Sequence, residues 1–134
     1  MDKTCDYIFV YGSLRSEFDS PVKSVLQDHA EFIGKATFQG KLYMIEWYPG
    51  VIESDDSSDK VIGEVYQIKN QKVLLSQLDQ YEGCSSHDPE PHEFIRRVKS
   101  VLLESGEKIR AWIYLFDQAV SDKERIFSGN FLHR

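Results

Sequence analysis

The sequence is poor in cysteine and proline and has no excess of positive charge. Its 134 residues include two cysteines, four prolines, 16 basic residues and 22 acidic residues, which gives a formal net charge of −6. Cys5 and Cys84 form no CxxC pair, so the sequence predicts two reduced thiols rather than a disulfide framework. The acidic balance argues against nucleic acid as a partner, because binding to phosphates requires a basic surface.

Long hydrophobic segments are also absent. No apolar run approaches the roughly 20 residues that a membrane-spanning helix needs, so we expect no membrane partner. Residues 1–7 lack the apolar stretch that is typical of a secretory signal, which favours a cytoplasmic location. The length and the 41% content of hydrophobic residues fit one domain over residues 1–134.

Apolar runs separated by turn residues predict an α+β fold. Strands are expected at residues 7–11, 31–38, 41–46, 61–68, 94–103 and 108–116, with turns at Gln39-Gly40, Pro49-Gly50 and Ser105-Gly106. One helix is expected at residues 21–28. A second is expected after Asn70, a plausible N-cap, with its natural stop at Gly83.

The strand expected at residues 108–116 is apolar on both faces. One face carries Ile109, Ala111, Ile113 and Leu115, and the other carries Trp112, Tyr114 and Phe116. Such a strand packs against a helix on one side and lines a barrel interior on the other. With the other strands, the pattern predicts a small mixed β-barrel of six or seven strands with two flanking helices.

A glycine and a hydroxyl end the first apolar run. After residues 7–11, the chain continues with Gly12 and Ser13. A sharp turn at this point leaves backbone N–H groups without strand partners, and such groups can bind a carboxylate or a phosphate. Gly12 would allow a ligand to approach the backbone closely. An ordinary connection between a strand and a loop explains these residues equally well.

Glu82 is the second residue that points to chemistry. It lies just before Gly83, at the expected C-terminus of the second helix, where the negative end of the helix dipole disfavours a carboxylate. This placement predicts a raised pKa for Glu82, as is suitable for a general base. A surface glutamate near a helix end is the alternative interpretation.

Taken together, these stretches resemble the gamma-glutamylcyclotransferase-like family. The resemblance rests on FVYGSLR (9–15), YPGV (48–51), GEVYQI (63–68), LDQYEG (78–83), EFIRRV (93–98), AWIYLF (111–116) and SGNFL (128–132). It spans nearly the whole chain and preserves both the order and the spacing of the motifs. It implies a small mixed barrel with flanking helices, in agreement with the strand pattern.

The resemblance also implies an activity and a set of site residues. The loop Tyr11, Gly12, Ser13 and Leu14 would bind the glutamyl group of a small-molecule γ-glutamyl substrate, and Glu82 would act as the general acid/base. The product would be 5-oxoproline, with release of an amine or amino acid. No metal or organic cofactor is expected, and the chain would be a monomer or a weak dimer.

One position departs from the family pattern. Phe94 stands where many family members carry a tyrosine, before a shared arginine at Arg96, which is the candidate for pairing with substrate or with a buried carboxylate.

A binding module that has lost turnover is the main alternative to an enzyme, and a protein–protein adaptor is a weaker one. Cys84 is an alternative nucleophile, although no histidine is placed by sequence to activate it. Cys84, His87, Asp88 and His92 share a loop, but their spacing fits no zinc pattern.

Overall fold

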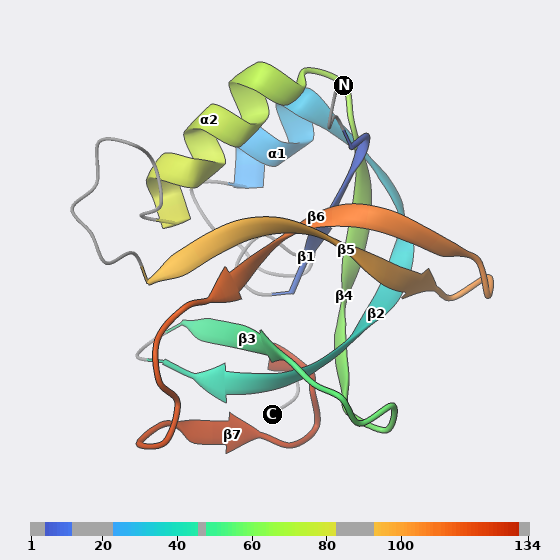
Figure 1. Cartoon of the computed structure of the whole chain (residues 1–134). Helices are drawn as coiled ribbons and strands as arrows, with labels where there is room; N and C mark the ends of the chain where they lie inside the picture. The colour runs from blue at the N-terminus through green and yellow to red at the C-terminus, as the bar shows by residue number, and fades with distance from the viewer. Residues whose placement is uncertain (1–4, 12–22, 46–47, 83–92, 132–134) are drawn as a thin grey trace.

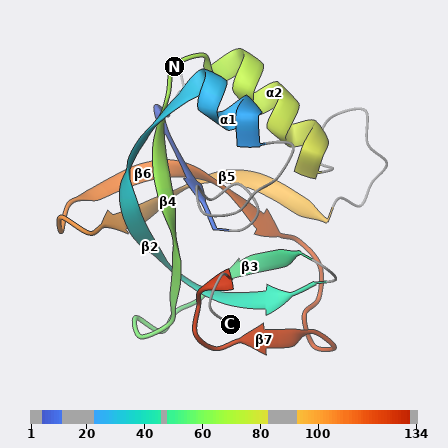
Figure 2. The same ribbon diagram turned by 180° about the vertical axis from the view of Figure 1, so that it is seen from behind.

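The computed structural model describes residues 5–11, 23–45, 48–82 and 93–131, with the backbone alone described at residues 23–25 and 80–82. Its elements are β1 (Tyr7–Val10), α1 (Lys23–His29), β2 (Ala30–Met44), β3 (Pro49–Glu53), β4 (Lys60–Ile68), α2 (Gln71–Glu82), β5 (Phe94–Leu103), β6 (Lys108–Phe116) and β7 (Glu124–Ile126). The two helices lie side by side at one end of the molecule, and β3 and β7 lie at the other (Figures 1 and 2).

The strands form a closed barrel with a small extension. The order β2-β4-β1-β6-β5 is closed by pairing of β5 with β2, and β3 and β7 both pair with the second half of β2. All the pairs are antiparallel except β1–β6. The expected α+β fold, a mixed barrel of six or seven strands with two helices, is therefore confirmed.

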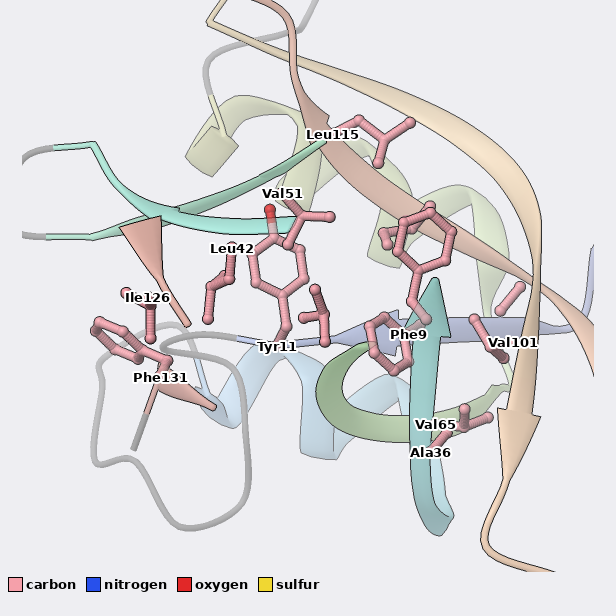
Figure 3. Close-up of a cluster of buried hydrophobic side chains, with 14 residues drawn as sticks. Phe9, Tyr11, Ala36, Leu42, Val51, Val65, Val101, Leu115, Ile126 and Phe131 are labelled. Atoms are coloured by element: carbon pink, nitrogen blue, oxygen red, sulfur yellow. The ribbon is translucent and has the colours of Figure 1, made fainter. Parts of the chain in front are cut away.

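The barrel interior is filled by alternate residues of its strands. Phe9, Tyr11, Val65 and Val101 belong to this inner cluster, which Figure 3 shows in close-up. The inner face of β6 consists of Ile109, Ala111, Ile113 and Leu115, as the alternation predicted. Burying one such aliphatic or aromatic side chain contributes about 1.5–3 kcal/mol, so this cluster is a main source of stability.

A second apolar cluster joins the barrel to the helices and positions α2. Leu74, Leu75 and Leu78 of α2 pack in it with Val10 and Tyr114. The other face of β6 thus packs toward the helices, as expected. Asn70 caps α2, with its side-chain oxygen accepting a hydrogen bond from the Val73 N–H at 3.4 Å.

Two of the expected turns are wrong. Gln39-Gly40 is not a turn, because β2 runs through it without a break and changes partner there: Gln39 pairs with β4, and Gly40 pairs with β3. A Cβ atom at Gly40 would lie 2.6 Å from the Ile52 carbonyl oxygen, so glycine serves a close approach of two strands. Pro49 and Gly50 are not a turn either, since both belong to β3.

The other boundaries agree closely with the sequence pattern. β5 and β6 begin and end at the expected residues, and Gly106 between them has a φ of +96°, which favours glycine in the connecting turn. β7, with three residues, was not predicted. Within the described part of the chain, no helix is long and apolar enough to span a membrane.

Candidate active site

The predicted site residues fall partly inside the described structure. Tyr11 directly follows β1, Glu82 is the last residue of α2, and Arg96 lies in β5. Gly12, Ser13, Leu14, Cys84, His87, Asp88 and His92 lie outside the described residues. The described part of the site therefore consists of the strand ends and the helix that lead into them.

A row of residues crosses the helix-facing side of the barrel at the end of β1. Val10 is paired with Glu64 of β4, and Tyr114 of β6 is paired with Arg96 of β5. Ile8 pairs in parallel with β6, and this register places Val10 beside Tyr114. The row therefore runs from a carboxylate to a guanidinium and passes through the last residue of β1.

Asp79 of α2 binds the guanidinium end of this row. Its Oδ1 accepts hydrogen bonds from Arg96 Nε at 2.8 Å and from the Tyr114 hydroxyl at 2.7 Å. Its Oδ2 accepts a third from Arg96 Nη2 at 3.0 Å. The side chains of Arg96 and Asp79 are only 23% and 18% exposed, so solvent screens this two-pronged ion pair less than it screens a surface pair.

Arg96 thus has a carboxylate partner, which is one of the two roles the sequence left open. Its guanidinium carbon also lies 4.4 Å from the centroid of the Trp112 ring, a cation–π arrangement. Arg97, the next residue, is exposed, and its Nη1 donates to the Arg96 carbonyl oxygen at 3.0 Å. Arg96 therefore faces α2 while Arg97 faces solvent, and a contact of Arg96 with substrate stays a prediction.

Tyr11 anchors the start of the predicted anion-binding loop. Its ring is buried in the inner cluster, and its hydroxyl donates a hydrogen bond of 2.6 Å to the Tyr114 carbonyl oxygen. The side chain therefore ties the end of β1 to β6. The predicted contribution of this residue to ligand binding was through the backbone of residues 11–14, and it stays a prediction.

We expect Tyr11→Phe to lower the free energy of unfolding by about 1–2 kcal/mol, because the variant leaves a buried carbonyl group without this donor. Urea denaturation followed by tryptophan fluorescence measures the change. Tyr7→Phe is the control, since the described residues provide no hydrogen-bond partner for the hydroxyl of this half-buried tyrosine. An equal loss in both variants would contradict the anchoring role of Tyr11.

Glu64 is a buried carboxylate at the other end of the row. It is 1% exposed, and its Oε1 accepts a hydrogen bond from the Tyr66 hydroxyl at 3.2 Å. Among the described residues it is the one fully buried charged side chain. Burial of a carboxylate is costly unless it is hydrogen-bonded, so Glu64 belongs to the polar framework at the end of β1.

An aromatic group borders the beginning of β5. The ring of Phe94 lies 6.1 Å from that of Tyr48 and 5.6 Å from that of Phe116, measured between centroids. The Tyr48 hydroxyl donates a hydrogen bond of 2.7 Å to Glu93 Oε1. A phenylalanine at position 94 therefore keeps the aromatic packing, and a hydroxyl is present on its neighbour Tyr48.

The described residues contain no group of three or more histidine, cysteine, aspartate or glutamate side chains placed to hold a metal ion. What they do contain is a polar framework between α2 and the end of β1. Such a framework holds the carboxylate of Asp79 near the end of β1, with an aromatic group beside it.

Comparison with known proteins assigns the chain to a family. A family model described as "Gamma-glutamyl cyclotransferase, AIG2-like" matches residues 8–133. The chain belongs to this family. The resemblance seen in the sequence motifs is therefore confirmed, and the matched region includes Tyr11, Glu82 and Arg96.

Individual members of the family match over most of the chain. A protein of Methanocaldococcus jannaschii, which its name assigns provisionally to the gamma-glutamylcyclotransferases, is 32% identical over 115 residues, covering 85% of this chain and 87% of that protein. The gamma-glutamylaminecyclotransferase of Bos taurus is 33% identical over 87 residues, or 58% of this chain and 48% of the bovine protein. The solution structure of YtfP from Escherichia coli has a TM-score of 0.65 at 29% identity, covering 96% of this chain and 97% of YtfP.

Sequence reasoning missed Asp79, although a signal for it was present. Leu75, Leu78 and Asp79 are spaced as one stripe of a helix, and Leu75 and Leu78 pack on the barrel. An aspartate within an apolar stripe requires a partner, and the arginine pair at positions 96 and 97 was the available source. In this cyclotransferase-like chain, the polar member of the stripe is the one that contacts the site framework.

Proposed function

We propose that the chain is a gamma-glutamylcyclotransferase-type enzyme that converts a γ-glutamyl amide into 5-oxoproline and a free amine or amino acid. The proposal is supported by one juxtaposition. Tyr114 binds Tyr11, from which the candidate glutamyl-binding loop continues, and also binds Asp79, which lies one helical turn before Glu82. Family membership supports the same conclusion.

In the proposed reaction, the α-amino nitrogen of the glutamyl group attacks its own γ-carbonyl carbon. A new C–N bond closes the five-membered lactam, and the original amide C–N bond breaks. The amine begins as an ammonium ion, which cannot attack, so Glu82 accepts its proton. Glu82 then gives that proton to the departing nitrogen, and the carboxylate is restored. The attacking nitrogen loses a second proton as the lactam forms, and the released amine takes up this proton to become an ammonium ion, so that protons and charge balance.

The tethering of nucleophile and electrophile explains why so few groups suffice. When both reacting atoms belong to one molecule and are well oriented, effective molarities reach the order of 10⁵ M or more. The protein needs to fold the glutamyl chain over and to manage two proton transfers. In the proposed mechanism, backbone N–H groups of residues 11–14 bind the α-carboxylate, which fixes the adjacent amine.

We expect the purified protein to release 5-oxoproline from at least one member of a panel of γ-glutamyl amides. The panel contains γ-glutamyl amino acids, γ-glutamyl alkylamines and γ-glutamyl groups on a lysine side chain, and mass spectrometry measures the product. The matching α-glutamyl compounds are the control, because their geometry cannot form the five-membered ring by this route. Release from γ-glutamyl compounds alone is the expected result.

Two other outcomes would contradict the proposal in different ways. Saturable binding of γ-glutamyl compounds without product would replace the enzyme by a binding module on the same fold. If no compound of the panel is bound and no product is formed, γ-glutamyl chemistry is excluded altogether.

A further inference from the structure

Helix α2 is held at both ends, at its beginning through the Cys5 carbonyl oxygen that β6 also binds, and toward its end by a direct contact with β6. At its beginning, Gln71 Nε2 donates to the Cys5 carbonyl oxygen at 2.6 Å, and Trp112 Nε1 donates to the same oxygen at 3.2 Å. Toward its end, Asp79 accepts the hydroxyl of Tyr114. Leucine packing alone would hold the helix against the barrel, but these directional contacts also fix its position along β6.

The contacts of Asp79 leave its carboxylate little freedom. Two nitrogens of Arg96 bind its two oxygens, and a phenol binds one of them as well. Arg96 in turn lies over the Trp112 ring, whose N–H donates to the Cys5 carbonyl oxygen that also accepts from Gln71 at the beginning of α2. The Arg96 guanidinium is bound along one edge by Asp79 and covered on one face by the Trp112 ring. It restricts the carboxylate more than a lysine would, because its two donors have a fixed geometry.

Tyr114 connects this carboxylate to the end of β1. Its side chain reaches Asp79, while its main-chain carbonyl accepts the hydroxyl of Tyr11 at 2.6 Å. One residue of β6 is therefore bound both to α2 near its C-terminal end and to the residue that begins the candidate glutamyl-binding loop.

We propose that Asp79, Arg96 and Tyr114 form a positioning unit that sets the distance between Glu82 and the loop that begins at Tyr11. This inference rests on the proposed function, because it assigns the general acid/base to Glu82. The three residues act through Glu82 and need not touch the substrate. Position 82 follows position 79 by about one helical turn, so fixing Asp79 fixes the last turn of α2.

The expected consequence is a loss of turnover rather than of binding. An intramolecular reaction depends on accurate placement of the proton acceptor, and a misplacement of about 1 Å costs on the order of 10²-fold in rate. Substrate affinity would depend mainly on the loop after Tyr11, which keeps its own tie to β6 through the main chain of Tyr114. A change in kcat with little change in KM is therefore the signature of positioning.

The chain provides a control in a second ion pair of the same shortest distance and similar burial. Arg125 Nη2 and Asp59 Oδ1 are 2.8 Å apart, and these side chains are 24% and 15% exposed. A hydrogen bond from the Ser54 hydroxyl, followed by the contact with Arg125, lowers the pKa of Asp59, so this carboxylate is charged at neutral pH. The pair lies away from α2, between the loop before β4 and the strand β7.

The first test compares Asp79→Asn with Asp59→Asn in steady-state assays of the full chain. We expect Asp79→Asn to lower kcat by on the order of 10²-fold and to change KM by less than about threefold. Asp59→Asn should leave both constants within about twofold of wild type. Thermal unfolding of both variants shows whether each remains folded at the assay temperature and whether the two lose similar stability.

The second test does not depend on turnover. Hydrogen–deuterium exchange of Tyr114→Phe, which removes only the hydroxyl, should be faster than wild type in peptides covering residues 78–82. Peptides covering residues 71–75 should be unchanged, because the Gln71 contact remains. Equal protection of residues 78–82 in wild type and Tyr114→Phe would overturn the positioning unit.

The kinetic outcomes separate this inference from the function on which it rests. A wild-type protein that forms no 5-oxoproline would overturn the proposed function and the role of Asp79 with it. Turnover in wild type, with equal kcat in Asp79→Asn and Asp59→Asn, would overturn the positioning role alone. A raised KM at unchanged kcat in Asp79→Asn would also overturn it, because that result assigns the Asp79–Arg96 pair to substrate binding.

Discussion

Glu82→Gln should reduce the release of 5-oxoproline by about 10³-fold while leaving ligand affinity within a fewfold of wild type. The amide has the size of the carboxyl group and keeps hydrogen-bonding capacity, but it cannot accept a proton at neutral pH. General acid/base groups contribute roughly 10²- to 10⁴-fold, and here one residue would perform both transfers. Product formation measured by mass spectrometry, together with calorimetric titration of 5-oxoproline, gives the two quantities.

The stability of this variant makes the result interpretable. Glu82 is the last residue of α2, and no basic residue lies in the final turn to offset its charge. A carboxylate at the negative end of a helix dipole is unfavourable by a few tenths of a kcal/mol or more, so Glu82→Gln should be at least as stable as wild type. If Glu82→Gln loses activity but is as stable as wild type by circular dichroism, Glu82 is required for function and does not stabilise the fold.

Cys84→Ala is the control that distinguishes the two candidate groups. Cys84 follows Glu82 closely in the sequence, and a thiolate nucleophile would be sensitive to alkylating reagents. We expect Cys84→Ala to retain near wild-type turnover and wild-type protein to tolerate alkylation. An inactive Cys84→Ala beside an active Glu82→Gln would show that the thiol carries the chemistry.

The sequence predicted those parts of the fold that depend on local pattern. The hairpin of β5 and β6 is the best example, because two apolar runs flank a turn that Gly106 marks. The start of α2 was likewise marked by a residue, Asn70, whose side chain caps the helix. In these places, the local preference and the final structure agree.

The errors arose where distant segments decide the outcome. Gly40 is a turn residue by local preference, but it lies in the middle of β2. Glycine is required there because the Ile52 carbonyl oxygen approaches too closely for a side chain. β7 has three residues and pairs only with the far half of β2, so its own sequence carries little signal. Neither the approach nor the pairing is visible in a window of a few residues.

The same limit applies to the candidate site. The motifs at residues 11–14 and at Glu82 were found separately, and only the resemblance to a family connected them. Their physical connection runs through Tyr114, whose partners Asp79 and Tyr11 lie 35 and 103 residues away in the sequence. Such a link depends on the register of β1 against β6, which the spacing of apolar residues does not specify.

The close packing of β4 against the end of β1 leads to the largest change in stability that we expect. Gly63 of β4 faces the barrel interior, paired with Ala36 of β2. A Cβ atom at Gly63 would overlap the Val10 carbonyl oxygen and would lie 2.6 Å from Phe9 Cζ. The oxygen belongs to the strand backbone, so it cannot rotate away as a flexible side chain could.

Gly63→Ala should therefore lower the free energy of unfolding by about 3 kcal/mol, as measured by urea denaturation. Gly34→Ala is the matched control, because Gly34 lies in the same β2–β4 pair and nothing lies within 4 Å of a Cβ atom built there. Neither glycine has a positive φ, so backbone strain does not distinguish them. The control should change stability by no more than about 0.5–1 kcal/mol, with stabilisation the more natural direction because alanine restricts the unfolded chain.

Equal stability of the two variants would mean that β1 can move away from β4 at little cost. That outcome would also weaken the account of the site, because Val10 is the residue from which Tyr11 and the candidate glutamyl-binding loop continue. A selective loss in Gly63→Ala would instead show that the end of β1 is held rigidly from below by β4, as it is held from the side by the bond of Tyr11 to Tyr114. A loop that binds a small anion through its backbone needs such a fixed origin, since each N–H group must point at the ligand before it arrives.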